Sequence, residues 1–157
     1  MTGMGEMKNC QQEYLRAKEE QRRLDREMLA IEERYIRENK IVNTIDGTVP
    51  CGIVDIYDDD TFMAADEACT NAAEEAGLTE KLQQAADALN AAEDALIKAA
   101  VELLPDRYLS EKETLTDSAR KSSVIREKII SYGMRLDTGL KKEMAAQEIA
   151  ETIGLEL

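Results

Sequence analysis

Histidine and tryptophan are absent from this chain of 157 residues, which also contains only one phenylalanine and two prolines. Without histidine, no Ser-His or Cys-His catalytic pair can form, and the usual imidazole metal ligand is missing. Only carboxylate, lysine, tyrosine or thiol chemistry remains, so we expect a non-enzymatic protein with no cofactor and no bound metal. The few prolines and glycines, together with abundant alanine, predict a mainly α fold.

Long apolar runs are also missing. No stretch approaches the roughly 18 apolar residues that a membrane span needs, and the N-terminal region is too charged for a secretory signal. Three cysteines without paired or metal-like spacing (Cys10, Cys51 and Cys69) are typical of reduced thiols in the cytosol. We therefore expect a soluble, cytoplasmic protein made of a single domain, residues 1–157.

The net charge of −13 comes from the middle of the chain. Residues 46–106 contain 15 acids and only two basic residues, Lys81 and Lys98, whereas the parts before and after them each contain nine acids and nine basic residues. A field of this size repels nucleic acid and membrane surfaces and attracts basic proteins. We therefore expect a basic protein partner, with no direct binding of nucleic acid or membrane.

Residues 6–42 have the pattern of one long coiled-coil helix. Mostly apolar side chains recur at alternating steps of three and four residues over five heptads, and no glycine or proline interrupts them. We expect a homodimer through this seam, although the sequence leaves open whether the seam pairs between chains or folds back on later helices of its own chain. The predicted dimer seam consists of Met7, Cys10, Tyr14, Ala17, Leu24, Met28, Ile31 and Tyr35.

Residues 41–57 are predicted to form a short β-hairpin or an extended connector. β-Branched residues stand on both sides of Asp46-Gly47, which is a strong two-residue turn signal. Pro50 and Gly52 interrupt the second half, after which residues 53–57 resume a strand-like pattern. An isolated hairpin is only marginally stable, so we expect this segment to lie against the helices.

Residues 58–104 are predicted to form an acidic, alanine-rich helical pair. An Asp or Thr within residues 58–61 caps the first helix, Gly77 ends it, and Thr79 caps the second helix. Small side chains along both helices predict a close antiparallel pair. The apolar positions are Phe62, Ala65, Cys69, Ala72 and Ala76 in the first helix, and Leu82, Ala85, Leu89, Ala92, Leu96, Ala99 and Leu103 in the second.

Residues 110–157 are predicted to form the C-terminal helices. Ser110 and Glu113 match a capping box, Gly133 ends or bends the helix that follows, and a last helix is expected over 140–153. One apolar stripe, with Ser122 inside it, comprises Leu115, Ala119, Ile125, Ile129, Tyr132 and Leu136.

Two partial motifs could carry metal chemistry. The carboxylates between Asp55 and Glu67 could bind a divalent cation, but the glycine of a calcium loop is missing. Glu148 and Glu151 form one Glu-x-x-Glu pair of the kind that holds magnesium in all-helical nucleotide pyrophosphohydrolases, without a second pair to face it. Solvated helix surfaces explain both patterns, so a metal-dependent helical hydrolase ranks third among the functions considered.

The favoured function is a non-enzymatic protein-binding module whose acidic helices occupy a basic site on a partner. Phage-type inhibitors of nucleic-acid-handling proteins, such as anti-CRISPR proteins and nucleic-acid mimics, share this size and charge, but no motif links them to this chain. The alternative is a structural or adaptor coiled-coil protein that acts through homodimerisation. The predicted partner-binding acids are Asp58, Asp59, Asp60, Asp66, Glu67, Glu74, Glu75, Asp87, Glu93 and Asp94.

Overall fold

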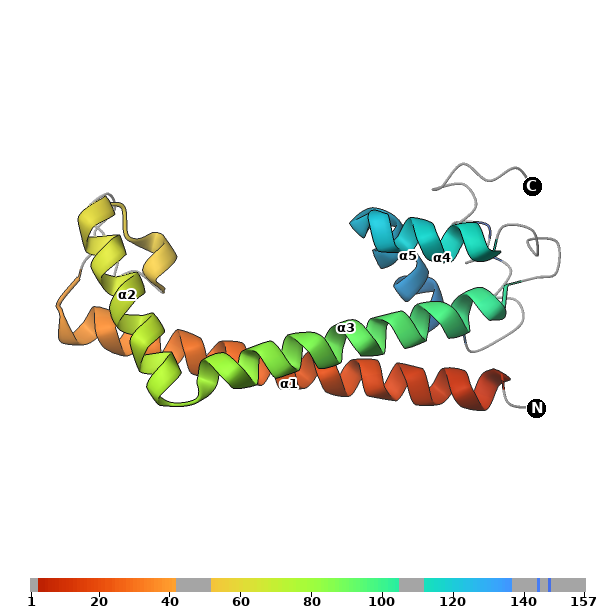
Figure 1. The fold of residues 1–157 in the computed structure, drawn as a ribbon, viewed down its shortest axis with the longest axis horizontal. Helices are drawn as coiled ribbons and strands as arrows, with labels where there is room; N and C mark the ends of the chain where they lie inside the picture. The colour runs from red at the N-terminus through yellow and green to blue at the C-terminus, as the bar shows by residue number, and fades with distance from the viewer. Residues whose placement is uncertain (1–2, 42–51, 105–111, 137–143, 145–146, 148–157) are drawn as a thin grey trace. The chain divides into compact units, whose positions relative to one another are not determined.

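The computed structural model describes residues 3–41, 52–104 and 112–136, together with Met144 and Gln147. These residues form five α-helices and one 3₁₀ helix, with no strand among them, which confirms the mainly α fold (Figure 1). No helix in this described part of the chain is long and apolar enough to cross a membrane.

The contacts divide the chain into two compact units, where the sequence predicts one domain. The terminal unit comprises Met1–Ala17 and Leu89–Leu157, and the central unit comprises Lys18–Ala88. Helix α1 (Gly3–Glu38) and helix α3 (Leu78–Glu102) each contribute residues to both units. Each unit has its own apolar core and is described by itself.

The core of the terminal unit joins the start of α1 to α3, α4 (Lys112–Lys121) and α5 (Ser123–Met134). Met7, Cys10 and Tyr14 of α1 are buried among apolar side chains that include Leu96 of α3 and Tyr132 of α5. The apolar stripes predicted for the second helix of the acidic pair and for the C-terminal helices are buried or half-buried at every apolar position, which confirms them. Helical periodicity therefore places these side chains correctly.

Ser122 separates α4 from α5. Its backbone is extended, and its hydroxyl oxygen accepts a hydrogen bond from the backbone N–H of Ile125 at 3.4 Å. The prediction that Ser122 lies inside one continuous helical stripe is wrong, because serine satisfies a free N–H at the start of a new helix.

Gly133 lies inside α5, one residue before its end, and is buried against α3. A Cβ atom added to it would lie 3.2 Å from Cβ of Ala100 and 3.2 Å from Cδ1 of Leu96. Its carbonyl oxygen also accepts a hydrogen bond of 2.7 Å from Nε2 of Gln11. The absence of a side chain at Gly133 therefore lets α5 approach α3 closely, as small residues do between packed helices.

The central unit packs helix α2 (Asp59–Glu75) and the first part of α3 on the second half of α1. Met28 and Ile31 of α1 pack against two apolar clusters, one around Leu24 and Ala73 and the other around Cys69. Hence both helices of the predicted acidic pair have α1 as a partner. In Figure 1, α2 lies beside the orange end of α1.

The ends of α2 agree with the sequence-based prediction more closely than the start of α3 does. Asp58 caps α2, which decides among the Asp and Thr candidates at residues 58–61, and Gly77, with a φ of +72°, follows the helix as predicted. Helix α3 begins directly at Leu78, so Thr79 lies in its first turn and does not cap it. Glycine adopts this left-handed conformation without the steric cost that a Cβ imposes, which allows the chain to reverse in a short connection.

Along α2 the buried positions are Ala65, Cys69 and Ala73. Ala72 and Ala76, which the sequence placed on the apolar stripe, are exposed. The stripe follows steps of four residues and therefore turns gradually around the helix.

The strand predicted over residues 53–57 is wrong. Ile53–Asp55 forms the 3₁₀ helix η1, and Ile53 is buried. The N–H of Ile53 donates to Oε1 of Glu32 at 3.1 Å, and the N–H of Gly52 donates to Oδ2 of Asp55 at 3.3 Å. Side-chain carboxylates thus satisfy the backbone donors that a partner strand would otherwise take.

Other predictions fall outside the described residues. They concern the Asp46-Gly47 turn of the hairpin, Ser110 of the capping box, and most of the helix expected over 140–153. Met144 and Gln147, the described residues of that last segment, are helical and exposed.

Candidate protein-interaction surface

Six of the ten predicted partner-binding acids lie on α2, and all six are exposed. They form three doublets separated by seven and eight residues, or about two helical turns, so the doublets project from one side of the helix. We call these six residues the acidic face: Asp59, Asp60, Asp66, Glu67, Glu74 and Glu75.

The acidic face has no compensating positive charge on its own helix, because α2 contains no lysine or arginine. Among the described residues, no ion pair involves any of its six carboxylates. The charge of the acidic face is therefore available to an external cation.

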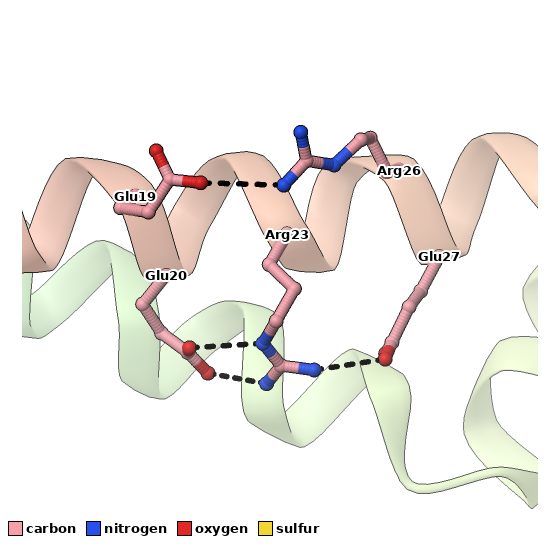
Figure 2. Close-up of polar contacts among 5 residues, drawn as sticks. All are labelled: Glu19, Glu20, Arg23, Arg26 and Glu27. Atoms are coloured by element: carbon pink, nitrogen blue, oxygen red, sulfur yellow. Dashed lines mark hydrogen bonds and ion pairs between the residues drawn. The ribbon is translucent and has the colours of Figure 1, made fainter.

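Several acids of α1 in the same unit are instead paired with arginine. Arg23 lies between two carboxylates, with Nη2 2.6 Å from Glu20 and Nη1 2.9 Å from Glu27 (Figure 2). Arg26 reaches Glu19 at 3.3 Å. These exposed pairs neutralise one another along the helix surface, as the alternating charges of that segment predict.

Asp58 is the N-cap of α2. Its carboxylate accepts hydrogen bonds from the hydroxyl and from the backbone N–H of Thr61, the latter at 2.9 Å. These two hydrogen bonds hold the pKa of Asp58 below its ordinary value. Asp87, on α3, is exposed and accepts a hydrogen bond of 3.0 Å from Nε2 of Gln83.

Glu93 and Asp94 belong to the terminal unit and are paired with Arg126. Nε of Arg126 lies 2.7 Å from Glu93, and Nη2 lies 2.8 Å from Asp94. These two acids hold α5 against α3 and are less available to a partner than the six of the acidic face.

A cavity of about 230 Å³ lies beside this ion pair. It is smaller than the roughly 300–1,000 Å³ of pockets that hold drug-sized ligands. Two of the cations that line it, Arg120 and Arg126, are already paired with carboxylates. We assign no ligand to it.

Three exposed apolar side chains close to the acidic face were not recognised as site residues from the sequence. Val54 is 81% exposed, Tyr57 65% and Met63 68%. Met63 could have been found, because it stands apart from the apolar stripe, among acids. The residues three and four positions before and after it, which are its neighbours on the helix surface, are Asp60, Asp59, Asp66 and Glu67.

All eight residues of the predicted dimer seam are buried or half-buried within the single chain. Met7 packs in the core of the terminal unit, whereas Leu24 and Met28 pack in the core of the central unit. A homodimer through this seam would therefore have to exchange these contacts for contacts with a second copy.

The two described cysteines are core residues. Cys10 and Cys69 are free thiols, and burial raises the pKa of each, with nearby carboxylates adding to the effect. A raised pKa keeps the sulfur protonated and weakly nucleophilic.

Within the described part of the chain, no three acidic or cysteine side chains are grouped as a metal ion would require. Comparison of the sequence and the fold with protein families, curated proteins and solved structures finds no match.

Proposed function

We propose that this protein is a non-enzymatic binding module whose acidic face occupies a basic site on a nucleic-acid-handling protein, as a phage-type inhibitor or nucleic-acid mimic would. The observation that supports it most directly is the row of three exposed acid doublets on α2, with no ion pair to them among the described residues. Carboxylates accept charge-assisted hydrogen bonds from arginine and lysine, as phosphate oxygens do.

Two physical features favour such a role for α2. Its apolar side, including Ala65 and Cys69, is packed in the core of the central unit, so the carboxylates project from a fixed helix. The negative charge is also concentrated, which speeds encounter with a basic partner and makes association weaken as salt rises.

The test is affinity capture from a nuclease-treated bacterial lysate, followed by identification of the retained proteins. Capture is compared at about 0.1 M and about 1 M salt, between which the Debye length falls from roughly 10 to 3 Å. We expect a basic, nucleic-acid-binding protein to be retained at low salt, released at high salt and displaced by added DNA.

Two charge variants make the test specific to α2. The first replaces the six acids of the acidic face by the matching amides and should abolish capture. The second makes the same change in charge at exposed acids elsewhere and should retain it, through Glu6→Gln, Glu13→Gln, Asp25→Asn, Glu33→Gln, Glu113→Gln and Glu127→Gln. Equal loss in both variants, or a retained protein that DNA does not displace, would exclude the proposed function.

The adaptor alternative acts through homodimerisation and needs the α1 seam to pair between chains. Sedimentation at micromolar concentration separates the two functions. A mass near the 17.6 kDa of one chain, unchanged by salt, removes the dimer, whereas twice that mass supports the adaptor.

A further inference from the structure

The charge density of the acidic face distinguishes between two kinds of nucleic acid. At 1.5 Å per residue, its six carboxylates are spread over about 24 Å of helix, or one charge per roughly 4 Å. A DNA duplex carries one phosphate per about 1.7 Å of its axis, or one per about 3.4 Å for each of its two strands. The acidic face therefore has less than half the charge density of a duplex, and its charge density is close to that of one of the two strands.

A second, independent observation concerns the exposed apolar side chains at the same end of α2. Tyr57 immediately precedes the cap of α2, and Met63 lies in the helix among four acids of the acidic face. Val54 is in η1, which contacts α2. Single surface apolar groups are ordinary, but these three lie within ten residues, and two of them, Tyr57 and Met63, are of types enriched at interfaces.

Grooves that bind single-stranded nucleic acid have a matching composition. Lysine and arginine follow the backbone, and aromatic side chains stack on successive bases. Such an aromatic side chain would also pack on the ring of Tyr57 or on the thioether of Met63, since sulfur makes favourable contacts with aromatic rings.

We propose that the acidic face, with Tyr57 and Met63, mimics single-stranded nucleic acid, its carboxylates taking the place of phosphates and these two side chains the place of bases. The partner site is then a groove that combines lysine or arginine with aromatic side chains. This inference rests on the proposed function and names the class of partner site that the acidic face fits.

The first test compares two eluents on the captured partner. These are an oligothymidine of about 16 nucleotides, the upper end of the site size of one single-strand-binding fold, and a DNA duplex of equal length. We expect the oligothymidine to elute the partner at a concentration at least about tenfold lower than the duplex, because it competes for both the basic and the aromatic groups.

The second test measures the affinity of the eluted partner for Tyr57→Ala/Met63→Ala as a function of salt. We expect binding to weaken about tenfold or more, the loss typical of a truncated interface anchor, with the salt dependence unchanged. Val124→Ala, which truncates an exposed apolar side chain of α5, is the matched control and should bind like the parent protein.

The outcomes separate the inference from the proposed function. Equal elution by duplex and oligothymidine, or undiminished binding by the Tyr57/Met63 variant, overturns mimicry of a single strand and leaves the proposed function intact. If no retained protein is displaced by either DNA, both are overturned.

Discussion

Nε of Arg126 on α5 lies 2.7 Å from Oε2 of Glu93 on α3, and the two side chains are only 21% and 19% exposed. Asp94 receives a second hydrogen bond from the same guanidinium. Burial alone would lower the pKa of Arg126, but the hydrogen bonds to both carboxylates and their negative charges together outweigh it, and the pKa is raised. This ion pair links the two helices and is less exposed than the pairs along α1.

Replacing Arg126 by Met should destabilise the terminal unit by about 1–3 kcal/mol, because it leaves the Glu93 carboxylate mostly buried without a partner. Urea unfolding of Arg126→Met, and of Arg126→Met with Glu93→Gln, measures this loss. The double variant should recover part of it. Arg34→Met, at the exposed Arg34–Glu38 pair, is the control and should change stability little; an equal effect there would contradict a special role for Arg126.

Gly133→Ala should lower stability by about 1 kcal/mol. The new Cβ overpacks against Ala100 and Leu96, which costs about 1–3 kcal/mol, while the better helix propensity of alanine returns up to about 1 kcal/mol. Gly5→Ala in α1 meets no atom within 4 Å and should instead stabilise by up to about 1 kcal/mol. Thermal unfolding of both variants checks this, and stabilisation by Gly133→Ala would show that α5 does not approach α3 so closely.

The cap of α2 should contribute stability that depends on pH. The pKa of Asp58 is held below its ordinary 3.8, so its ionised form stabilises the fold above that pH, and this contribution is lost as the pH falls through the lowered value. The melting temperature of the parent protein should therefore exceed that of Asp58→Asn near neutral pH, and the difference should shrink below about pH 4.

Thr61→Val provides the control for this pH dependence, because it removes the hydroxyl donor and leaves the Asp58 carboxylate in place. Its melting temperature should show a smaller loss in the acid range than the parent protein shows. A difference between parent and Asp58→Asn that stays constant from neutral pH to pH 3 would contradict the lowered pKa.

The α1 seam can be tested at Leu24, which is 1% exposed in the core of the central unit. Leu24→Ala should cost about 2–5 kcal/mol, as truncation of a buried leucine does. If the seam packs within one chain, the melting temperatures of parent and variant do not change with protein concentration. A melting temperature that rises between about 1 and 100 μM would show that the seam pairs between chains, since oligomers gain stability by mass action.

Local pattern was enough to predict most of the helices. The apolar stripes through Leu96 and Ile129 are buried as their periodicity indicates, and Asp58 and Gly77 bound α2 as their residue types suggest. The errors occur where the local sequence is compatible with two different backbone structures. Ser122 is compatible with a helix interior and with a cap. Residues 53–57 are rich in β-branched residues, as strands are, although carboxylates satisfy the backbone of Gly52 and Ile53.

The sequence predicted that the candidate site consists of acidic residues, but it could not tell which of these acids are paired within the chain. Asp66 and Asp94 are both exposed acids on alanine-rich helices, and nothing in their immediate sequence separates them. Arg126, 32 positions after Asp94, pairs with it, whereas no ion pair to Asp66 occurs among the described residues. The exposure of Tyr57 and Met63 likewise depends on how η1 and α2 pack on α1.

The sequence by itself determined the helical class, the faces that become buried and the concentration of negative charge in the middle of the chain, because these follow from residue type and periodicity. Only the tertiary structure decided which acids are neutralised and what covers the α1 seam. Heptad spacing specifies that a helix such as that around Leu24 needs an apolar partner, but not where in the chain that partner lies. Its partner here comes from residues such as Ala73 and Ala85, far along the chain, whose position only the folded unit defines.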